Sequence, residues 1–302
     1  MIKLIVSFIS NNFYRIVKRH IDKKMIKAKL EINFIKINGD SFEYWDNNAS
    51  KPAIFLVHGF GTSAEYQWYK QVNVLSKDYR IIIPNLFYFG RSNSISKKFR
   101  IEDQVEFINL LSKHLNLDSI IFFGISYGGQ IAIDFTKKYP QIVKSLVIVN
   151  SPIKFYNIKD VEEICESFDV SNLQDLFVPH NYKDLKKIFY LALGKKWILP
   201  SFFLKPFYKN LYINNFNEKR HLISHSVDRI NHFTKVNYSF DTPTLMIYGG
   251  NDKITSTDKA LLLKNHIGNN AKFTLIKKGT HMPNITQTDK FNEIVLNFLN
   301  KA

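Results

Sequence analysis

The sequence has only one cysteine, Cys165, in 302 residues. A single cysteine cannot form a disulfide within the chain, so a disulfide-stapled fold is excluded. It also has no cysteine neighbours with which to hold zinc, and we interpret it as a small buried apolar side chain. No apolar run reaches the length of about 18 residues that a membrane-spanning helix needs. What is left is a chain whose 45% hydrophobic and 23% charged residues are typical of an ordinary globular protein.

Acidic residues are scarce as well. The chain has 26 Asp and Glu against 42 Lys and Arg, which gives a formal net charge of +16. Residues 1–30 hold eight Lys and Arg and one Asp, whereas residues 31–151, 152–240 and 241–302 carry net charges of only +2, +4 and +3. A protein that binds nucleic acid more often spreads basic side chains over a folded face beside a recognition motif. The sequence has no such motif, so we expect no nucleic-acid partner.

Residues 1–27 are predicted to form a basic amphipathic helix. Apolar residues at three- and four-residue spacing fall on one helical face, and here they are Ile2, Ile5, Val6, Ile9, Phe13, Ile16, Val17 and Ile21. Residues 1–26 could lie on an anionic membrane surface, pack on the body of the protein, or act as a signal peptide. Export is the weakest of the three, because the apolar stretch Leu4–Ile9 is short and no small-residue cleavage site follows. We therefore expect a cytoplasmic or peripherally membrane-associated protein.

After residue 27, short apolar strands alternate with helical patterns. Continuous apolar runs are typical of parallel strands covered on both faces, and the alternation predicts an α/β fold with a mostly parallel sheet and flanking helices. The expected strands are Lys29–Ile37, Ser41–Trp45, Ala53–Val57, Tyr79–Ile83, Ser119–Phe123, Ser145–Val149, Thr244–Tyr248 and Lys272–Ile276, the first two joined as a hairpin. The expected helices are Gln67–Ser76, Glu102–Leu115, Gly129–Tyr139, Thr257–His266 and Asp289–Asn300.

One long stretch interrupts this alternation. Residues 152–240 contain no convincing strand and many aromatic residues, and prolines divide them into several helical segments. The core is therefore predicted at 28–151 and 241–302, with 152–240 inserted as a helical cap, or lid, over the ends of the strands. Ligands bind at the carboxyl ends of strands in open α/β sheets, so an aromatic cap there could wall an apolar pocket. Most of these aromatics are expected to form the core of the cap itself.

The segment Gly124-Ile125-Ser126-Tyr127-Gly128 lies between a predicted strand and a predicted helix. This is the G-x-S-x-G pattern in the strand–turn–helix setting where it exposes a nucleophilic serine. The glycines allow a strained turn to project Ser126 toward the pocket, and the start of the helix places backbone N–H groups beside it.

A nucleophilic serine needs a base, and the base needs an acid that orients it. In this architecture the chain order is Ser, then Asp or Glu, then His. Asp252 follows the strand Thr244–Tyr248, and His281 follows the strand Lys272–Ile276, so both are expected at the same sheet edge as Ser126. Asp241 and Asp258 are poorer candidates, since one precedes its strand and the other begins a helix.

The segment His58-Gly59-Phe60-Gly61 ends the strand Ala53–Val57. In this architecture such a loop supplies one N–H of the oxyanion hole, here Phe60, and the residue after the nucleophile, Tyr127, supplies the other. His58 is interpreted as a residue that braces this loop. No metal and no organic cofactor are expected.

These motifs resemble the α/β-hydrolase fold family over roughly residues 30–300, and most closely its monoacylglycerol lipase-like and esterase branch. The matching stretches are His58–Gly61, Gln67-Trp68, Pro84–Ser92 and Gly124–Gly129. The resemblance implies Ser126, Asp252 and His281 as a catalytic triad and Phe60 with Tyr127 as the oxyanion hole. Two positions depart from the family pattern: Thr280 stands where Gly usually precedes the histidine, and Asn85 where Asp usually precedes Leu86.

The predicted function is a serine hydrolase of carboxylic esters that works through an acyl-enzyme. The aromatic cap and the amphipathic segment favour an acyl or lipid ester, such as a monoacylglycerol, as substrate. Other readings stay open: an esterase for acyl-thioesters or acyl-carrier-protein esters, a carbon–carbon bond hydrolase, or a non-catalytic receptor. A serine at position 126 speaks against haloalkane dehalogenase and epoxide hydrolase chemistry, which needs a carboxylate nucleophile there.

Overall fold

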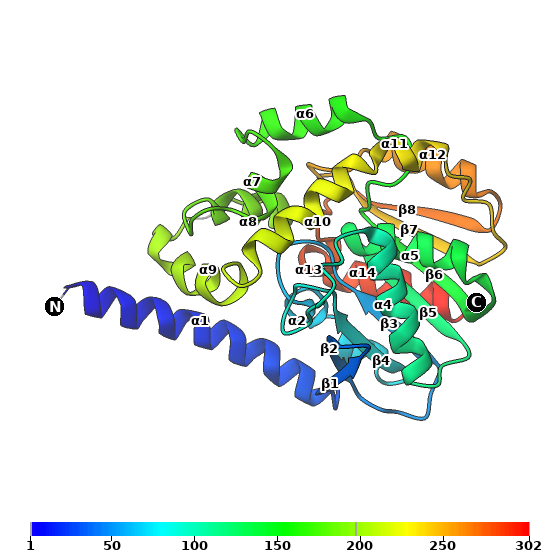
Figure 1. Cartoon of the computed structure of the whole chain (residues 1–302), viewed down its shortest axis with the longest axis horizontal. Helices are drawn as coiled ribbons and strands as arrows, with labels where there is room; N and C mark the ends of the chain where they lie inside the picture. The colour runs from blue at the N-terminus through cyan, green and yellow to red at the C-terminus, as the bar shows by residue number, and fades with distance from the viewer. Residues whose placement is uncertain (1, 197, 302) are drawn as a thin grey trace.

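The computed structural model of the chain describes residues 2–196 and 198–301, without the side chains of residues 2–4 and 232. Within these residues, eight strands form one sheet in the order β1-β2-β4-β3-β5-β6-β7-β8 (Figure 1). β1 pairs antiparallel with β2 and β2 with β4, whereas all later neighbours are parallel. The strands are β1 (Glu31–Ile37), β2 (Asp40–Asp46), β3 (Ala53–Val57), β4 (Arg80–Asn85), β5 (Ile120–Ile125), β6 (Val143–Val149), β7 (Thr244–Gly249) and β8 (Ala271–Ile276).

Helices cover both faces of the sheet, which confirms the predicted α/β class. Successive side chains of a strand point to opposite faces. In β5, Phe122 packs in one apolar cluster with helices α4 (Ile101–His114), α5 (Tyr127–Lys138) and α12 (Thr257–Ile267). Its neighbour Phe123 packs on the other face with α1 (Ile2–Lys27), α2 (Ala64–Trp68), α3 (Val72–Leu75) and α14 (Thr288–Leu299). The sheet is therefore the middle of three layers.

Residues 152–240 form helices and, among the described residues of this range, no strand. They stand at the end of the sheet where the parallel strands finish, as Figure 1 shows for α7, α8 and α10. The elements of this cap are α6 (Ile158–Ser167), α7 (Leu173–Phe177), α8 (Leu185–Leu193), η2 (Ser201–Leu204), α9 (Lys205–Leu211), α10 (Phe216–Asp228) and α11 (Ile230–Lys235). Two short elements complete the chain, η1 (Pro140–Ile142) and α13 (Pro283–Thr286).

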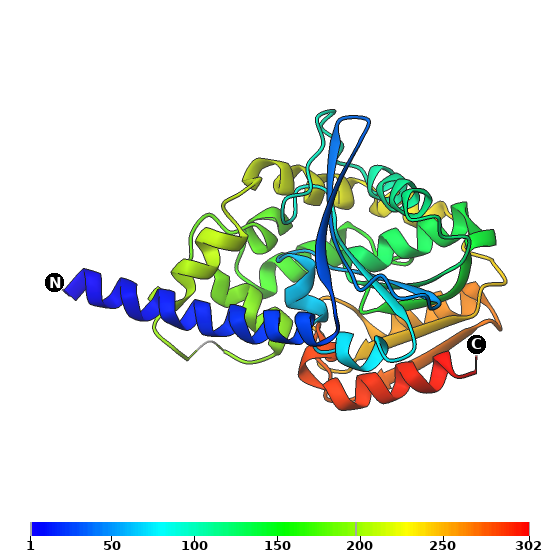
Figure 2. The ribbon, with the colours of Figure 1, turned by 90° about the horizontal axis from the view of Figure 1, so that it is seen from below.

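Helix α1 is long, and its two halves have different surroundings (Figures 1 and 2). Its second half packs on the body, where Ile21 and Met25 are buried against α2 and α3. Farther forward, Phe13 and Tyr14 make edge-to-face contacts with Phe203 and Phe207 of the cap. The first turns of α1, which carry the exposed side chains of Ile5, Phe8 and Ile9, extend past the core and are called the free arm. No helix in the described residues is both long enough and apolar enough to span a bilayer.

The predicted strands and the hairpin are confirmed with shifts of one or two residues at their ends. The single helix expected at Gln67–Ser76 is wrong: the chain forms two short helices, α2 and α3, separated by a tight turn at Tyr69–Gln71. The helix expected from Gly129 begins at Tyr127, directly after Ser126. Lys29, expected within the first strand, adopts a positive φ of 59° and precedes it.

The expectation that α1 has one apolar face is also wrong in part. Phe13, Val17 and Ile21 point inward, as their four-residue spacing requires. Ile16, expected on the same face, is 64% exposed, and Ile5 and Ile9 are exposed too. The side chain of Ile2 lies outside the described residues. The apolar residues of α1 lie on several sides of the helix. Their spacing in the sequence therefore does not show which of them pack against the protein and which are exposed.

Candidate active site

Ser126 sits in a strained turn between β5 and α5. Its φ of 53° and ψ of −118° place it in a region that side chains with a Cβ rarely adopt. Glycines allow the close packing around this turn: a Cβ on Gly124 would come within 2.3 Å of the Gly128 oxygen. A Cβ on Gly128 would come within 2.5 Å of the Val57 oxygen. The G-x-S-x-G spacing is thus a steric requirement for projecting the serine above the sheet.

The structure brings Ser126, His281 and Asp252 together in one hydrogen-bonded series. His281 Nε2 lies 3.0 Å from Ser126 Oγ, and His281 Nδ1 lies 2.9 and 3.0 Å from the two carboxylate oxygens of Asp252. The ionised carboxylate can only accept, so Nδ1–H donates to Asp252 and Nε2 is left to accept the Ser126 hydroxyl proton. This is the tautomer that a base for Ser126 needs.

The loop after β7 fixes the Asp252 carboxylate. The backbone N–H of Ile254 donates to Asp252 Oδ1 at 2.8 Å, and the Thr255 hydroxyl donates to Oδ2. The Asp252 side chain has no solvent exposure, and that of His281 has 6%. In this dry setting the interaction between the carboxylate and the imidazole is weakly screened, so it orients the ring strongly.

Phe60 and Tyr127, the two candidate oxyanion donors, lie on different segments next to Ser126. Tyr127 is the first residue of α5, and the first N–H groups of a helix have no partner within it. In the described part of the chain, no protein group accepts a hydrogen bond from the Phe60 N–H. The loop of Phe60 is close to the nucleophile, since a Cβ on Gly59 would lie 3.0 Å from Ser126 Cβ. Phe60 and Tyr127 also line the cavity around Ser126.

Gln67 of α2 positions the Phe60 loop. Its side-chain oxygen accepts from the Gly59 N–H at 2.8 Å, and its Nε2 donates to the Gly59 carbonyl at 3.0 Å. One side chain thus satisfies both backbone groups of the residue before Phe60. From the sequence, Gln67 was expected to begin a helix and belonged to a stretch that matches the family, but it was given no role in the site.

His58 braces the same loop from the other side, as predicted. Its Nδ1 donates to the Gly59 carbonyl at 2.7 Å, and its Nε2 accepts from the Leu86 N–H at 3.1 Å. Complete burial lowers the pKa of His58 to about 4, which keeps the ring neutral. A neutral ring is required, because an imidazolium could not accept from Leu86.

Asn150, at the end of β6, connects the loops of the acid and the base. Its Nδ2 donates to the carbonyls of Thr280 and His281 at 2.7 and 2.9 Å, and its Oδ1 accepts from the Gly249 N–H at 2.8 Å. The sequence reasoning missed this residue. The sequence offered one signal for it: Asn150 is a polar residue directly after a predicted buried strand.

The two departures from the family pattern have structural explanations. Asn85 accepts from the Ala64 N–H at 2.8 Å and donates to Glu43 at 3.2 Å, whereas an aspartate would place a second carboxylate against Glu43. The Thr280 hydroxyl donates to the Ala192 carbonyl of α8 at 2.6 Å. Thr280 therefore ties the histidine loop to the cap.

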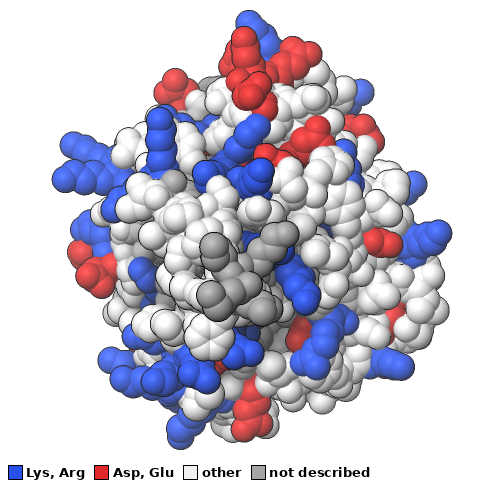
Figure 3. Space-filling model, turned by 90° about the vertical axis from the view of Figure 1, so that its left-hand side faces the viewer, with Lys and Arg blue, Asp and Glu red and all other residues white. Residues whose placement is uncertain are grey.

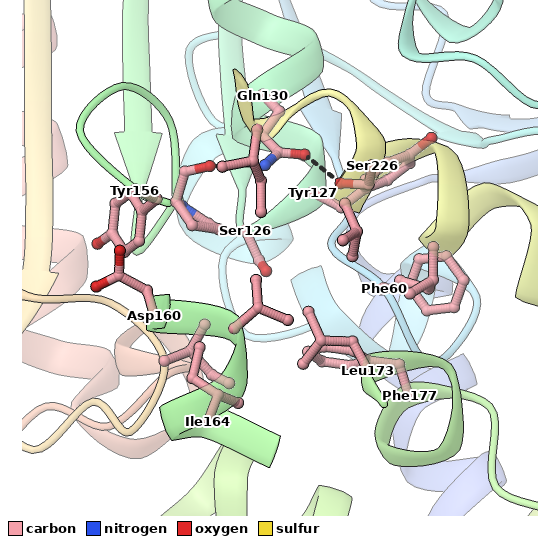
Figure 4. Close-up of a pocket in the computed structure, with 16 residues that line it drawn as sticks. Phe60, Ser126, Tyr127, Gln130, Tyr156, Asp160, Ile164, Leu173, Phe177 and Ser226 are labelled. Carbon is pink, nitrogen blue, oxygen red and sulfur yellow. Dashed lines mark hydrogen bonds between the residues drawn. The ribbon is translucent and has the colours of Figure 1, made fainter. Parts of the chain in front are cut away.

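Two apolar cavities meet at Ser126. The smaller, of about 70 Å³, lies between Tyr127 and the cap helices α6, α7 and α10 (Figure 4). In Figure 4, Ile164, Leu173 and Phe177 face Ser126 across this cavity. The larger, of about 290 Å³, lies between His281 and helices α1, α2, α8 and α9. Ser126, Phe60 and Phe177 border both cavities.

Comparison with known proteins places this chain among hydrolases. Residues 52–288 match the family model described as alpha/beta hydrolase fold. Lipase 1 of Psychrobacter immobilis is 27% identical over 270 residues, covering 87% of this chain and 82% of the relative. Epoxide hydrolase 4 of Mus musculus is 23% identical over 288 residues, covering 88% and 78%. Other relatives are named as an esterase/lipase and as a monoacylglycerol lipase.

A solved structure agrees over nearly the whole chain. The protein named lip1 from Acinetobacter baumannii AYE superposes with a TM-score of 0.82 at 24% identity. The match covers 94% of this chain and 95% of that one. At this identity the likeness concerns the fold alone.

Proposed function

The chain belongs to the α/β-hydrolase family, and we propose that it is a serine hydrolase of carboxylic esters that carry apolar chains. The observation that supports this most is the hydrogen-bonded series Ser126–His281–Asp252 beside two apolar cavities. Lipases and esterases among the relatives support the same class. Epoxide hydrolase chemistry needs a carboxylate nucleophile, and Ser126 occupies that position.

The proposed reaction has two steps. In the first, Ser126 Oγ attacks the ester carbonyl carbon while His281 Nε2 takes the hydroxyl proton. The oxyanion that forms accepts hydrogen bonds from the N–H groups of Phe60 and Tyr127, each worth about 3–4 kcal/mol in such sites. The bond from the carbonyl carbon to the alcohol oxygen then breaks, and His281 gives its proton to that oxygen.

In the second step, water attacks the acyl-enzyme. His281 takes a proton from the water, which attacks the carbonyl carbon of the acyl group on Ser126. The new tetrahedral centre breaks its bond to Oγ, the proton returns to Oγ, and the carboxylic acid leaves. Throughout, Asp252 holds the imidazole in the required tautomer and stabilises the imidazolium.

Hydrolysis of p-nitrophenyl acetate, octanoate and palmitate tests the proposal, with Ser126→Ala as control. Because both cavities are apolar, the octanoate ester should be cleaved with a higher kcat/KM than the acetate ester. Ser126→Ala should lower kcat by at least about 1000-fold, since the nucleophile is lost. A sharp preference for acetate contradicts an acyl-chain substrate, and undiminished activity of Ser126→Ala contradicts the serine mechanism.

We also propose that the free arm of α1 binds an anionic membrane surface. Ile5, Phe8 and Ile9 are exposed there, with Phe8 at 67%. Figure 3 looks onto the end of the molecule where α1 begins; Lys and Arg side chains are spread over this face, and Asp and Glu side chains gather mainly at its top. Apolar side chains next to basic ones match a lipid surface that offers acyl chains and negative headgroups.

Flotation with vesicles of phosphatidylglycerol and phosphatidylcholine tests this membrane proposal. The double variant Phe8→Asp/Ile9→Asp should reduce the floated fraction at least about fivefold, because two apolar anchors become acidic. Ile95→Asp is the matched control, since Ile95 is 69% exposed but lies outside α1. Equal flotation of the double variant and the wild type, or flotation unchanged at high salt, contradicts the proposal.

A further inference from the structure

The two cavities at Ser126 differ in which catalytic group they border. His281 lines the larger cavity and is absent from the residues around the smaller one within the described part of the chain. Tyr127, which offers an N–H for the oxyanion, lines the smaller cavity and not the larger. Of these two residues, His281 therefore borders only the larger cavity and Tyr127 only the smaller one, whereas Ser126 and Phe60 border both.

This difference between the cavities indicates which cavity binds the alcohol half of an ester and which binds the acyl half. When the acyl-enzyme forms, the leaving oxygen must receive a proton from His281 Nε2, so it must lie against that nitrogen. Nε2 is 3.0 Å from Ser126 Oγ, and of the two cavities only the larger is lined by described atoms of His281. The group attached to the leaving oxygen consequently starts in the larger cavity, and the acyl group has the smaller one.

The larger cavity is walled in part by α1. Val17 and Ile21 line it, together with Ile188 of the cap and Tyr66 of α2. The helix is held in place there, since the Tyr14 and Tyr66 hydroxyls are 3.1 Å apart and Tyr14 packs edge-on against Phe207. This cavity is about four times the volume of the smaller one, at 290 against 70 Å³.

We propose that the preferred substrate has a long apolar alcohol and a shorter acyl group, and that α1 helps to select it by forming the wall of the alcohol cavity. This inference rests on the proposed serine-esterase function. This differs from the monoacylglycerol expected from the sequence, whose glycerol is small and polar and would leave the larger cavity unfilled. A lipid whose leaving group carries its own hydrocarbon chain fills it.

Two isomeric esters test which cavity takes the alcohol chain and which takes the acyl chain. Octyl butanoate and butyl octanoate have the same composition and the same ester bond, and differ only in which side carries the longer chain. The wild type should hydrolyse octyl butanoate with a kcat/KM about tenfold higher, since each methylene in a fitting pocket contributes severalfold. Equal rates, or a preference for butyl octanoate, overturn the inference. Hydrolysis of neither ester overturns the proposed function itself.

Variants in the two walls should change the ratio of the two rates in opposite directions. Val17→Trp narrows the larger cavity and should shift the ratio about tenfold toward butyl octanoate. Val161→Trp, in the wall of the smaller cavity, should shift it toward octyl butanoate. Ile16→Trp is the matched control on α1, because Ile16 points to solvent and should leave the ratio unchanged.

A second variant covers the case in which Val17→Trp does not fold. Val17→Ala enlarges the same cavity and should raise the rate for dodecyl butanoate relative to butyl octanoate. Circular dichroism and thermal melting verify the fold of each variant. A shift of the ratio by Ile16→Trp as large as that by Val17→Trp, or no shift by either Val17 variant, overturns the role of α1.

Discussion

At the scale of single residues, the oxyanion loop depends on Gln67. The side chain holds both backbone groups of Gly59 and so fixes the direction of the next N–H, that of Phe60. Gln67 also lines the larger cavity, but its amide is engaged with the loop. We therefore regard it as a positioning residue, which acts on the reaction through Phe60.

Replacing Gln67 by Leu should lower kcat by about 10- to 100-fold and leave KM within about twofold, because the oxyanion forms only in the transition state. Steady-state kinetics on p-nitrophenyl octanoate provide the measurement. Gln141→Leu is the matched control, since Gln141 is exposed and lies in η1, outside the site. A rise in KM at unchanged kcat would show that Gln67 serves substrate binding instead.

His58 should make the protein sensitive to mild acid. Its pKa falls from an ordinary 6.5 to about 4 in the folded state, so above pH 6.5 both states are neutral and the stability is complete. As the pH falls toward 4, the unfolded chain takes up the proton first and stability is lost. From pH 7 to pH 5 this loss should be about 2 kcal/mol.

Urea unfolding at pH 7 and pH 5 measures this loss. His58→Gln keeps a donor and an acceptor but does not titrate, so its stability should fall by about 2 kcal/mol less than that of the wild type over the same interval. If both proteins lose the same free energy of unfolding between pH 7 and pH 5, other groups cause the acid sensitivity.

The residues of the candidate triad could be predicted because their signal is local: each follows a recognisable strand in a fixed chain order. Gln67 and Asn150 could not be assigned a role in the same way. Their partners, Gly59 for Gln67 and Thr280 and Gly249 for Asn150, come from other loops. An amide side chain has no sequence pattern of its own until the fold has placed those loops.

At the scale of elements, the cap is tied to the core by a buried ion pair. Arg229, directly after α10, lies 2.5 Å from Asp134 of α5, and both side chains are 12% exposed. The Tyr238 hydroxyl donates to the other oxygen of Asp134 at 2.8 Å. Burial raises the pKa of the Asp134 carboxyl, and the Arg229 guanidinium opposes this rise.

Arg229→Met should destabilise the protein by about 3 kcal/mol, because it leaves the Asp134 carboxylate buried without its cation. The double variant Arg229→Met/Asp134→Asn should recover most of this loss, since no charge then remains buried. Urea unfolding of wild type, both single variants and the double variant gives the measurement. A double variant as unstable as Arg229→Met would show that the loss comes from packing of the arginine stem.

Helix α1 shows which features of an element can be predicted from the sequence and which cannot. Its existence and its approximate ends are predictable from periodicity. Which apolar residues face inward depends on what the helix meets: α2, α3 and the cap take up Phe13, Val17 and Ile21, while the arm that carries Phe8 extends past them. The break between α2 and α3 is equally hard to predict, because the turn at Tyr69–Gln71 contains no glycine or proline.

At the scale of the whole molecule, the sheet explains why distant segments form one site. The parallel strands β3, β5, β6, β7 and β8 end at one edge, and each contributes a loop to the candidate site, from Phe60 to His281. The cap closes this edge from above and α1 from the side. The basic N-terminal helix, noted first for its charge, therefore also borders the space in which a substrate would lie.

The central claim is that Ser126 is the nucleophile, and labelling with a fluorophosphonate probe tests it most directly. The wild type should gain one covalent label, located on Ser126 by peptide mass spectrometry, because His281 makes the hydroxyl reactive. His281→Ala should label at least about 100-fold more slowly, and Ser126→Ala should not label there at all. An unlabelled wild type, or a Ser126→Ala variant labelled as strongly as the wild type, would contradict the account.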